Sequence, residues 1–157
     1  MRKIVMKRLL AVGTLVLTIL LLPMTSLAED ITSGEGQLDI KITNIKNPSG
    51  TIHLSLQNSA QGWLSTDADV KTFLDVSQEI TSTDDIVISV EGLPAGHYAI
   101  SLFHDLNENL DLDTNFIGYP KEPFGFSAPM GMMGPPKFED AVVEVSTGKS
   151  SLEIELN

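Results

Sequence analysis

The chain has 157 residues and no cysteine, which fits one domain and excludes disulfide scaffolds, cysteine zinc sites and thiol catalysis. Its 10 basic and 21 acidic residues give a formal net charge of −11. This balance repels phosphate backbones and anionic lipid surfaces, so we expect no nucleic acid among its partners.

Residues 1–28 have the pattern of an export signal. Four basic residues among the first eight precede the apolar run Leu9–Leu22, Pro23 ends this run, and small residues follow at Ser26 and Ala28, where a signal peptidase would cut. The apolar run is shorter than the ~20 residues of a membrane-spanning helix, so a retained anchor is only the alternative. We therefore expect cleavage near Ala28, a mature chain without a transmembrane helix, and a periplasmic or extracellular location.

Residues 29–157 keep all 21 acidic residues but only 6 lysines and no arginine, which is a net charge of −15. Without arginine this part lacks the usual bidentate grip on carboxylates and phosphates, so a cation or a neutral molecule is favoured as ligand. The alternative is that the negative charge only keeps an exported protein soluble.

Apolar and polar residues alternate with a period of two along much of the mature chain. Leu38, Ile40 and Ile42, for example, are separated by Asp39 and Lys41. Because neighbouring side chains of a strand point to opposite faces, this alternation predicts strands with one buried face. Six such strands are expected, at residues 38–42, 52–56, 86–90, 98–102, 141–145 and 152–156.

Turn-forming residues separate several of these strands. Asn47–Gly50, Leu93–Gly96 and Thr147–Lys149 each supply a proline or a glycine, and we interpret them as hairpin-like connections. Residues 59–84 are ambiguous, since Trp63–Phe73 fits either a short edge strand or one helical turn. The sequence predicts an all-β fold, an antiparallel β-sandwich of about seven strands that is immunoglobulin-like or transthyretin-like, with a closed barrel as the alternative.

A long loop, residues 104–137, has no sustained period. Connections of this length in a small domain are typically functional or disordered. Five large apolar residues give this loop enough surface to fold back over the sandwich, so we expect it to be ordered. They are Phe116, Ile117, Tyr119, Phe124 and Phe126.

The start of the loop carries oxygen-bearing side chains at every second residue: Asp105, Asn107, Asn109, Asp111 and Asp113. Calcium loops use this spacing because alternate residues of a tightly curled loop direct their oxygens to one centre. An EF-hand has glycine and glutamate where this chain has Leu110 and Phe116, and Glu122 is the nearest carboxylate that could close the shell. The alternative to a Ca²⁺ site is a turn whose side chains bond neighbouring backbone groups.

A set of short blocks follows in order along the mature chain: Leu93–Ala99, Phe103–Asp105 with Asn107, Asn109, Leu112, Asp113 and Asn115, then Gly118–Glu122, Phe124–Ser127 and Phe138–Ala141. Together these blocks resemble the bacterial domain-of-unknown-function family 2141 (DUF2141). The resemblance covers about the whole mature chain and implies an exported, all-β envelope domain without an assigned activity. The sequence departs from the family at Leu110, where members usually have glycine.

Aromatic residues provide a second candidate site. Trp63, Tyr119, Phe124 and Phe126 could form a stacking surface for a sugar or a peptide without any metal. His104 continues the apolar row of its strand, so we expect it to point inward at the mouth of the loop, either as a hydrogen-bonded core residue or as a ligand or acid–base group.

Two further chemistries have less support in the sequence. Met130, Met132 and Met133 could hold Cu(I), although methionines in a loop rich in glycine and proline more often serve as apolar cover. An envelope hydrolase built around His104 and Asp105 is the enzymatic alternative. We favour a non-enzymatic binding module for an unknown envelope ligand or protein, with a long loop that Ca²⁺ could order, over a metal-free carbohydrate- or peptide-binding module.

Overall fold

Strands form where apolar and polar residues alternate along the sequence. The computed structural model describes residues 34–65 and 69–157, and the predicted export signal lies outside them. The described residues contain eight strands and one short helix: β1 (Glu35–Thr43), β2 (Thr51–Gln57), β3 (Leu74–Glu79), β4 (Ile86–Pro94), β5 (Gly96–Asp105), β6 (Phe124–Phe126), α1 (Phe138–Ala141), β7 (Val142–Val145) and β8 (Gly148–Glu155). All six predicted segments overlap strands; Ala141 belongs to α1 instead, and Leu156 lies one residue past β8.

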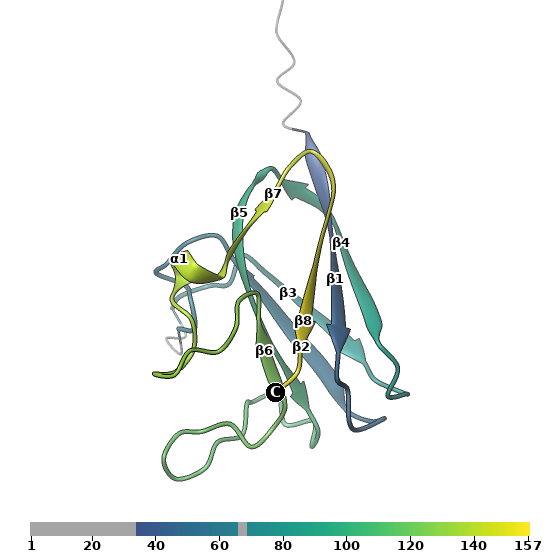
Figure 1. Cartoon of the computed structure of the whole chain (residues 1–157), viewed down its shortest axis with the longest axis vertical. Coiled ribbons are helices and arrows are strands. Elements are labelled where there is room, and N and C mark those ends of the chain that lie inside the picture. Colours follow the sequence, from purple (N-terminus) through teal and green to yellow (C-terminus); the bar gives the residue numbers. More distant parts are fainter. Residues whose placement is uncertain (1–33, 66–68) are drawn as a thin grey trace, which may run out of the picture. The chain divides into compact units, whose positions relative to one another are not determined.

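The strands lie in two sheets (Figure 1). One sheet has the order β4-β1-β8, and the other has the order β3-β2-β5-β6, with β7 also paired with β5. The all-β, sandwich-like fold is therefore confirmed. Every pairing is antiparallel except that of β1 with β8, which runs parallel from Gly36 opposite Gly148 to Thr43 opposite Glu155. These strands are far apart in sequence, so no connecting turn sets their direction.

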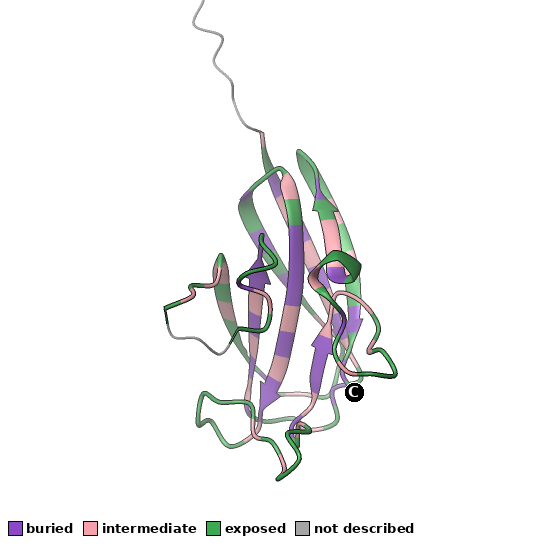
Figure 2. Cartoon of the chain, turned by 90° about the vertical axis from the view of Figure 1, so that its left-hand side faces the viewer, coloured by how far each residue is buried: buried purple, intermediate pink, exposed green. Residues whose placement is uncertain are grey.

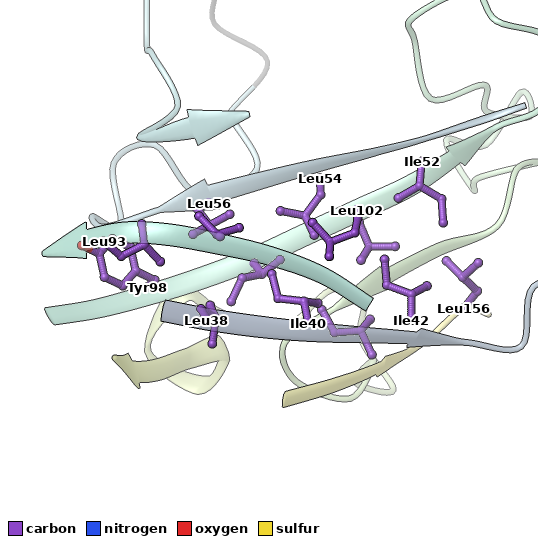
Figure 3. Packing of buried hydrophobic residues seen from close by; sticks show 14 of the residues in the cluster. Leu38, Ile40, Ile42, Ile52, Leu54, Leu56, Leu93, Tyr98, Leu102 and Leu156 are labelled. Atoms are coloured by element: carbon purple, nitrogen blue, oxygen red, sulfur yellow. The ribbon is translucent and has the colours of Figure 1, made fainter. Parts of the chain in front are cut away.

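The apolar rows of the two sheets face each other and form the core. Leu38, Ile40 and Ile42 of β1 are at most 1% exposed, and Figure 3 shows them opposite Leu54 and Leu102 of the other sheet. Burying each such side chain contributes roughly 1.5–3 kcal/mol. Figure 2 shows the consequence along the strands, where buried and partly exposed residues alternate.

The prediction of three hairpin-like connections was wrong, because each of these connections carries the chain from one sheet to the other. Residues 47–50 lie between β1 and β2, Ala95 lies between β4 and β5, and Thr147 lies between β7 and β8. Turn residues reverse the chain without deciding whether the next strand pairs with the last one or packs over it. Packing over it brings two apolar faces together, which buries both.

Two segments without a clear period each lead into a strand. β3 begins just after the ambiguous Trp63–Phe73 stretch and pairs with β2. β6 lies inside the predicted long loop and pairs with β5, but its three residues are too few to reveal a period. A single helical turn, α1, precedes β7. The described residues include no helix with the length and apolar character that a bilayer crossing requires.

Candidate functional site

Two rows of side chains on the outer face of the larger sheet form the floor of a pocket. In one row His53 of β2 lies opposite Phe103 of β5, which lies opposite Phe124 of β6. Directly opposed residues project from the same face of a sheet, so strand register alone assembles this floor. The neighbouring row on the same face of the sheet consists of Ser55, Ser101 and Phe126. All six residues line the pocket.

Three connections form the walls of this pocket, and the one between β2 and β3 contributes Leu64 and Ser65. The connection between β5 and β6, which we call the acidic loop (residues 106–123), contributes Leu112 and Ile117–Pro120. The connection between β6 and α1 contributes Met130 and Pro135. In Figure 1 the acidic loop is the green trace at the bottom of the view, and the connection between β6 and α1 is the yellow-green trace at the left. The pocket has a volume of about 590 Å³, within the roughly 300–1,000 Å³ of small-molecule sites.

His53 connects the floor to the acidic loop. Its Nδ1 lies 2.9 Å from Ser77 Oγ on the edge strand β3, and its ring packs against that of Phe103 with centroids 5.1 Å apart and a tilt of 34°. Its Nε2 lies 3.4 Å from Asp105 Oδ2. This last contact lacks hydrogen-bond geometry, so it is an electrostatic contact rather than a bond.

Asp105 holds the start of the acidic loop. The side chain is 0% exposed, and its oxygens accept the backbone N–H groups of Asn109 (3.3 Å) and Leu110 (2.8 Å). Burial acts to raise the pKa of Asp105, but the amides of Leu110, Asn109 and Glu108 donate to the carboxylate and, with His53, lower the pKa below its ordinary value of 3.8. A buried, ionised carboxylate therefore lies beside the pocket floor.

Glu122 holds the other end of the acidic loop. This side chain is 7% exposed; its Oε1 accepts the N–H of Leu106 (2.8 Å) and its Oε2 accepts the N–H of Asp113 (3.1 Å). Asn107 Nδ2 donates to Asp113 Oδ2 at 2.8 Å. Asn109 Nδ2 lies 3.5 Å from the other Asp113 oxygen.

The predicted calcium ligands are thus mostly brought together. Asp111 is the exception, because it joins the network only through its N–H, which donates to Asn109 Oδ1 at 2.9 Å. The side-chain-to-backbone turns of the alternative interpretation are present, since Asn107 Oδ1 also accepts the Asn109 N–H. Within the described residues, no group of three or more His, Asp or Glu side chains could hold a metal ion, so a Ca²⁺ shell here would need the asparagine oxygens.

Leu110 adopts the backbone conformation that a glycine would favour. Its φ is 69°, in the left-handed region, which costs a residue with a Cβ about 1–2 kcal/mol. The side chain is 74% exposed, so packing does not explain this conformation. The left-handed conformation is instead explained by the hydrogen bond that the Leu110 N–H donates to the buried carboxylate of Asp105.

The predicted ligand surface divides into two parts. Tyr119, Phe124 and Phe126 line the pocket. Trp63 packs beside it, with its ring centroid 6.0 Å from that of Phe126 and its Nε1 donating to Pro136 O at 2.8 Å.

His104 points inward as predicted and lies away from this surface. It is 0% exposed, and its Nε2 lies 2.8 Å from Ser49 O. Because Asp105 projects from the opposite face of β5, the two residues of the hydrolase hypothesis do not meet.

The methionine segment forms a tight turn at the pocket margin. Gly131 and Gly134 pair across it, and Met132 and Met133 at its tip are fully exposed. Met130 alone of the three methionines lines the pocket. The structure therefore places two of the proposed Cu(I) ligands in solvent and the third on a wall.

Sequence reasoning missed four floor residues, namely His53, Ser55, Ser101 and Phe103. They lie on the rows that the alternation marks as polar and solvent-facing. One signal was available: Phe103 is a large apolar residue on an outward row, and an aromatic ring there indicates that something covers that face.

A family model described as an uncharacterized protein conserved in bacteria (DUF2141) matches residues 40–153, the stretch that runs from β1 into β8. No curated protein and no solved structure matches the chain.

Proposed function

The chain belongs to DUF2141, a family of uncharacterized bacterial proteins, and we propose that it is an exported module that binds a small, largely apolar molecule. The observation that carries the proposal is the pocket of about 590 Å³ on the larger sheet. Export rests on the signal pattern of residues 1–28.

The lining has the composition of a small-molecule site. Aromatic and aliphatic side chains dominate it, and a few polar groups, among them His53 and the hydroxyls of Ser55 and Ser101, lie on its floor. Such sites combine apolar walls with a small number of fixed polar groups that orient the ligand.

The neutral fluorescent probe N-phenyl-1-naphthylamine tests this proposal. We expect saturable 1:1 binding to the mature protein. Ser101→Phe, which fills the floor of the pocket, should weaken binding about tenfold or more, equivalent to about 1.4 kcal/mol. Val87→Phe is the matched control, because Val87 lies on the other sheet and is 57% exposed. Absence of probe binding, or equal loss in both variants, would overturn the proposal. Sugars and peptides enter as competitors of the probe.

Calcium binding by the acidic loop stays a prediction of the sequence. It is supported by the spacing of the oxygens and by the left-handed Leu110. For Ca²⁺ to bind, the Asn107 and Asn109 amides would have to rotate so that their oxygens, and not their NH₂ groups, face Asp113; the two orientations are nearly equal in shape.

Thermal melts with CaCl₂ and with a chelator test this prediction. A site filled at a hundredfold excess over its Kd raises the free energy of unfolding by about 2.7 kcal/mol. Leu110→Gly should raise the melting temperature with Ca²⁺ and with chelator alike, because it removes the left-handed penalty from a conformation that Leu110 already adopts. Identical melts with Ca²⁺ and with chelator, in wild type and variant alike, would remove calcium from the account.

Hydrolysis is a second candidate, because His53 lies between Ser77 and buried Asp105. A nucleophile, a base and a carboxylate are the groups of acyl-transfer catalysis. Ser77 should then be labelled by a fluorophosphonate probe, and His53→Gln should abolish labelling while the melt is retained. Failure of Ser77 to react under conditions that label a known serine hydrolase would exclude this candidate.

A further inference from the structure

We infer that the pocket selects a compact organic cation, an ammonium group carried on an apolar body. The inference rests on the proposed function and deepens it by naming the ligand class. Three observations support it: the aromatic lining of the pocket, the buried carboxylates next to it and the negative charge of the chain.

Aromatic rings from three segments line the pocket. Phe103 belongs to β5, Tyr119 to the acidic loop, and Phe124 and Phe126 to β6. The centroids of Tyr119 and Phe124 are 6.2 Å apart and those of Phe124 and Phe126 are 5.7 Å apart, and both pairs meet edge to face. Rings at such angles present differently oriented π faces, and these faces attract an ammonium group by their quadrupoles.

Two buried carboxylates lie next to the pocket. No lysine or arginine occurs among the described lining residues. Oδ2 of buried Asp105 lies 3.4 Å from Nε2 of His53 on the floor. The buried carboxylate of Glu122 lies in the acidic loop. Because buried charges are screened less by salt and solvent than exposed ones, this arrangement favours a cation and opposes an anion.

The charge of the whole chain acts in the same direction. The net charge of −11, or −15 for residues 29–157 alone, raises the local concentration of cations and their association rate, in a manner that depends on ionic strength. Neutral apolar molecules gain nothing from this field, so the field adds to the discrimination made inside the pocket.

Three probes of nearly equal shape test the inference. Benzyltrimethylammonium, neopentylbenzene and benzylsulfonate each attach a tetrahedral group to the same benzyl body, and they carry a positive charge, no charge and a negative charge. Each is titrated against the protein with bound N-phenyl-1-naphthylamine. We expect the cation to displace the dye at a concentration about 2- to 30-fold lower than its neutral isostere, the range that corresponds to roughly 0.5–2 kcal/mol of cation–π attraction, and the anion to be weakest.

The variant Tyr119→Leu separates the aromatic contribution from burial. Tyr119 is 55% exposed, so its replacement should leave the fold intact while removing one π face. The preference for the cation over the neutral isostere should fall, and the affinity for neopentylbenzene should change less. Phe103→Leu provides a second variant, and Val87→Thr on the other sheet is the control.

Equal or stronger displacement by neopentylbenzene would overturn the cation inference and leave the proposed pocket in place. Failure of all three probes to displace a bound dye would also overturn it. If the dye itself does not bind, the proposed function fails, and the two failures are therefore distinguishable.

Discussion

Tyr98 is the residue whose ionisation should limit stability at alkaline pH. It is 3% exposed and donates its hydroxyl to Pro94 O at 2.8 Å. Burial raises the pKa of its phenol above the ordinary value of 10.0. Because the folded-state pKa is the higher one, the stabilising contribution is complete below pH 10 and is lost as the pH rises through the folded-state pKa.

Tyr98→Phe should therefore cost about 1 kcal/mol at pH 7, where a hydrogen bond is lost, and should lose less stability than the wild type between about pH 9 and pH 11. Urea unfolding at a series of pH values measures both effects. Tyr119→Phe, which removes a tyrosine outside the core, is the matched control and should keep the wild-type profile. Parallel alkaline losses in Tyr98→Phe and wild type would contradict the assignment.

Gly125 is required by a close approach of the two sheets. A Cβ at this position would lie 2.6 Å from Ile154 Cγ2 and 3.2 Å from Glu155 O. Gly125→Ala should destabilise the fold by about 1–3 kcal/mol, the typical cost of overpacking, and should weaken dye binding because Phe124 and Phe126 flank it. Gly96→Ala, whose Cβ would meet its nearest atom at 3.7 Å, should cost far less. Denaturant midpoints measure the stability of both variants. Equal losses of stability would show that the close approach of the sheets does not require Gly125.

At the scale of elements, local pattern predicts strands well and their partners poorly. The alternation in β1, β2, β4 and β5 locates them because each buries one whole face. Sheet membership depends on which strand packs over which, and turn residues such as those at 47–50 do not encode it. The parallel β1–β8 pair depends on residues far apart in sequence.

In the candidate site, too, the features that depend on local sequence were predictable and those that depend on strand pairing were not. The oxygens of the acidic loop could be identified from their spacing, because they interact within one short segment. The pocket floor could not, because His53, Phe103 and Phe124 become neighbours only through strand register. Phe124 was singled out as an aromatic residue, yet its partners on β2 and β5 were not predictable from local pattern.

The acidic loop should behave as one unit held by Glu122. This carboxylate accepts N–H groups from Leu106 and Asp113, which are well separated in the loop. Glu122→Gln replaces one acceptor oxygen by a donor that faces an N–H group, so we expect a loss of about 1–3 kcal/mol of local stability. Hydrogen exchange of the loop amides should accelerate while exchange in β1 and β2 stays slow.

The exposed Asp111→Asn is the control for Glu122→Gln, because its carboxylate takes no part in the described network. Equal exchange rates in the two variants would show that Glu122 does not hold the loop. Accelerated exchange in β1 as well would show that the loop and the sandwich unfold together.

At the scale of the whole molecule, the described ion pairs are too few to offset the acidic charge. Lys41 lies 2.9 Å from Asp85 and 3.1 Å from Glu153, and Lys149 lies 2.7 Å from Asp39. These pairs join β1 to β8 and to Asp85, which immediately precedes β4. Exposed ion pairs contribute only about 0–1 kcal/mol each, whereas residues 29–157 have 21 acidic residues against 6 lysines.

Salt should therefore make the fold more stable, because it screens the repulsion among the carboxylates. Between about 0.01 M and 0.1 M ionic strength the screening length falls from about 30 Å to about 10 Å, so repulsion between distant carboxylates weakens more than attraction within contacting pairs. We expect the free energy of unfolding to rise with NaCl, and MgCl₂ at equal ionic strength to produce a similar rise. Any additional rise with CaCl₂ measures a specific site, because general screening does not distinguish the two divalent ions. A fall in stability with NaCl would show that the ion pairs of the smaller sheet, and not the net charge, dominate the electrostatics of folding.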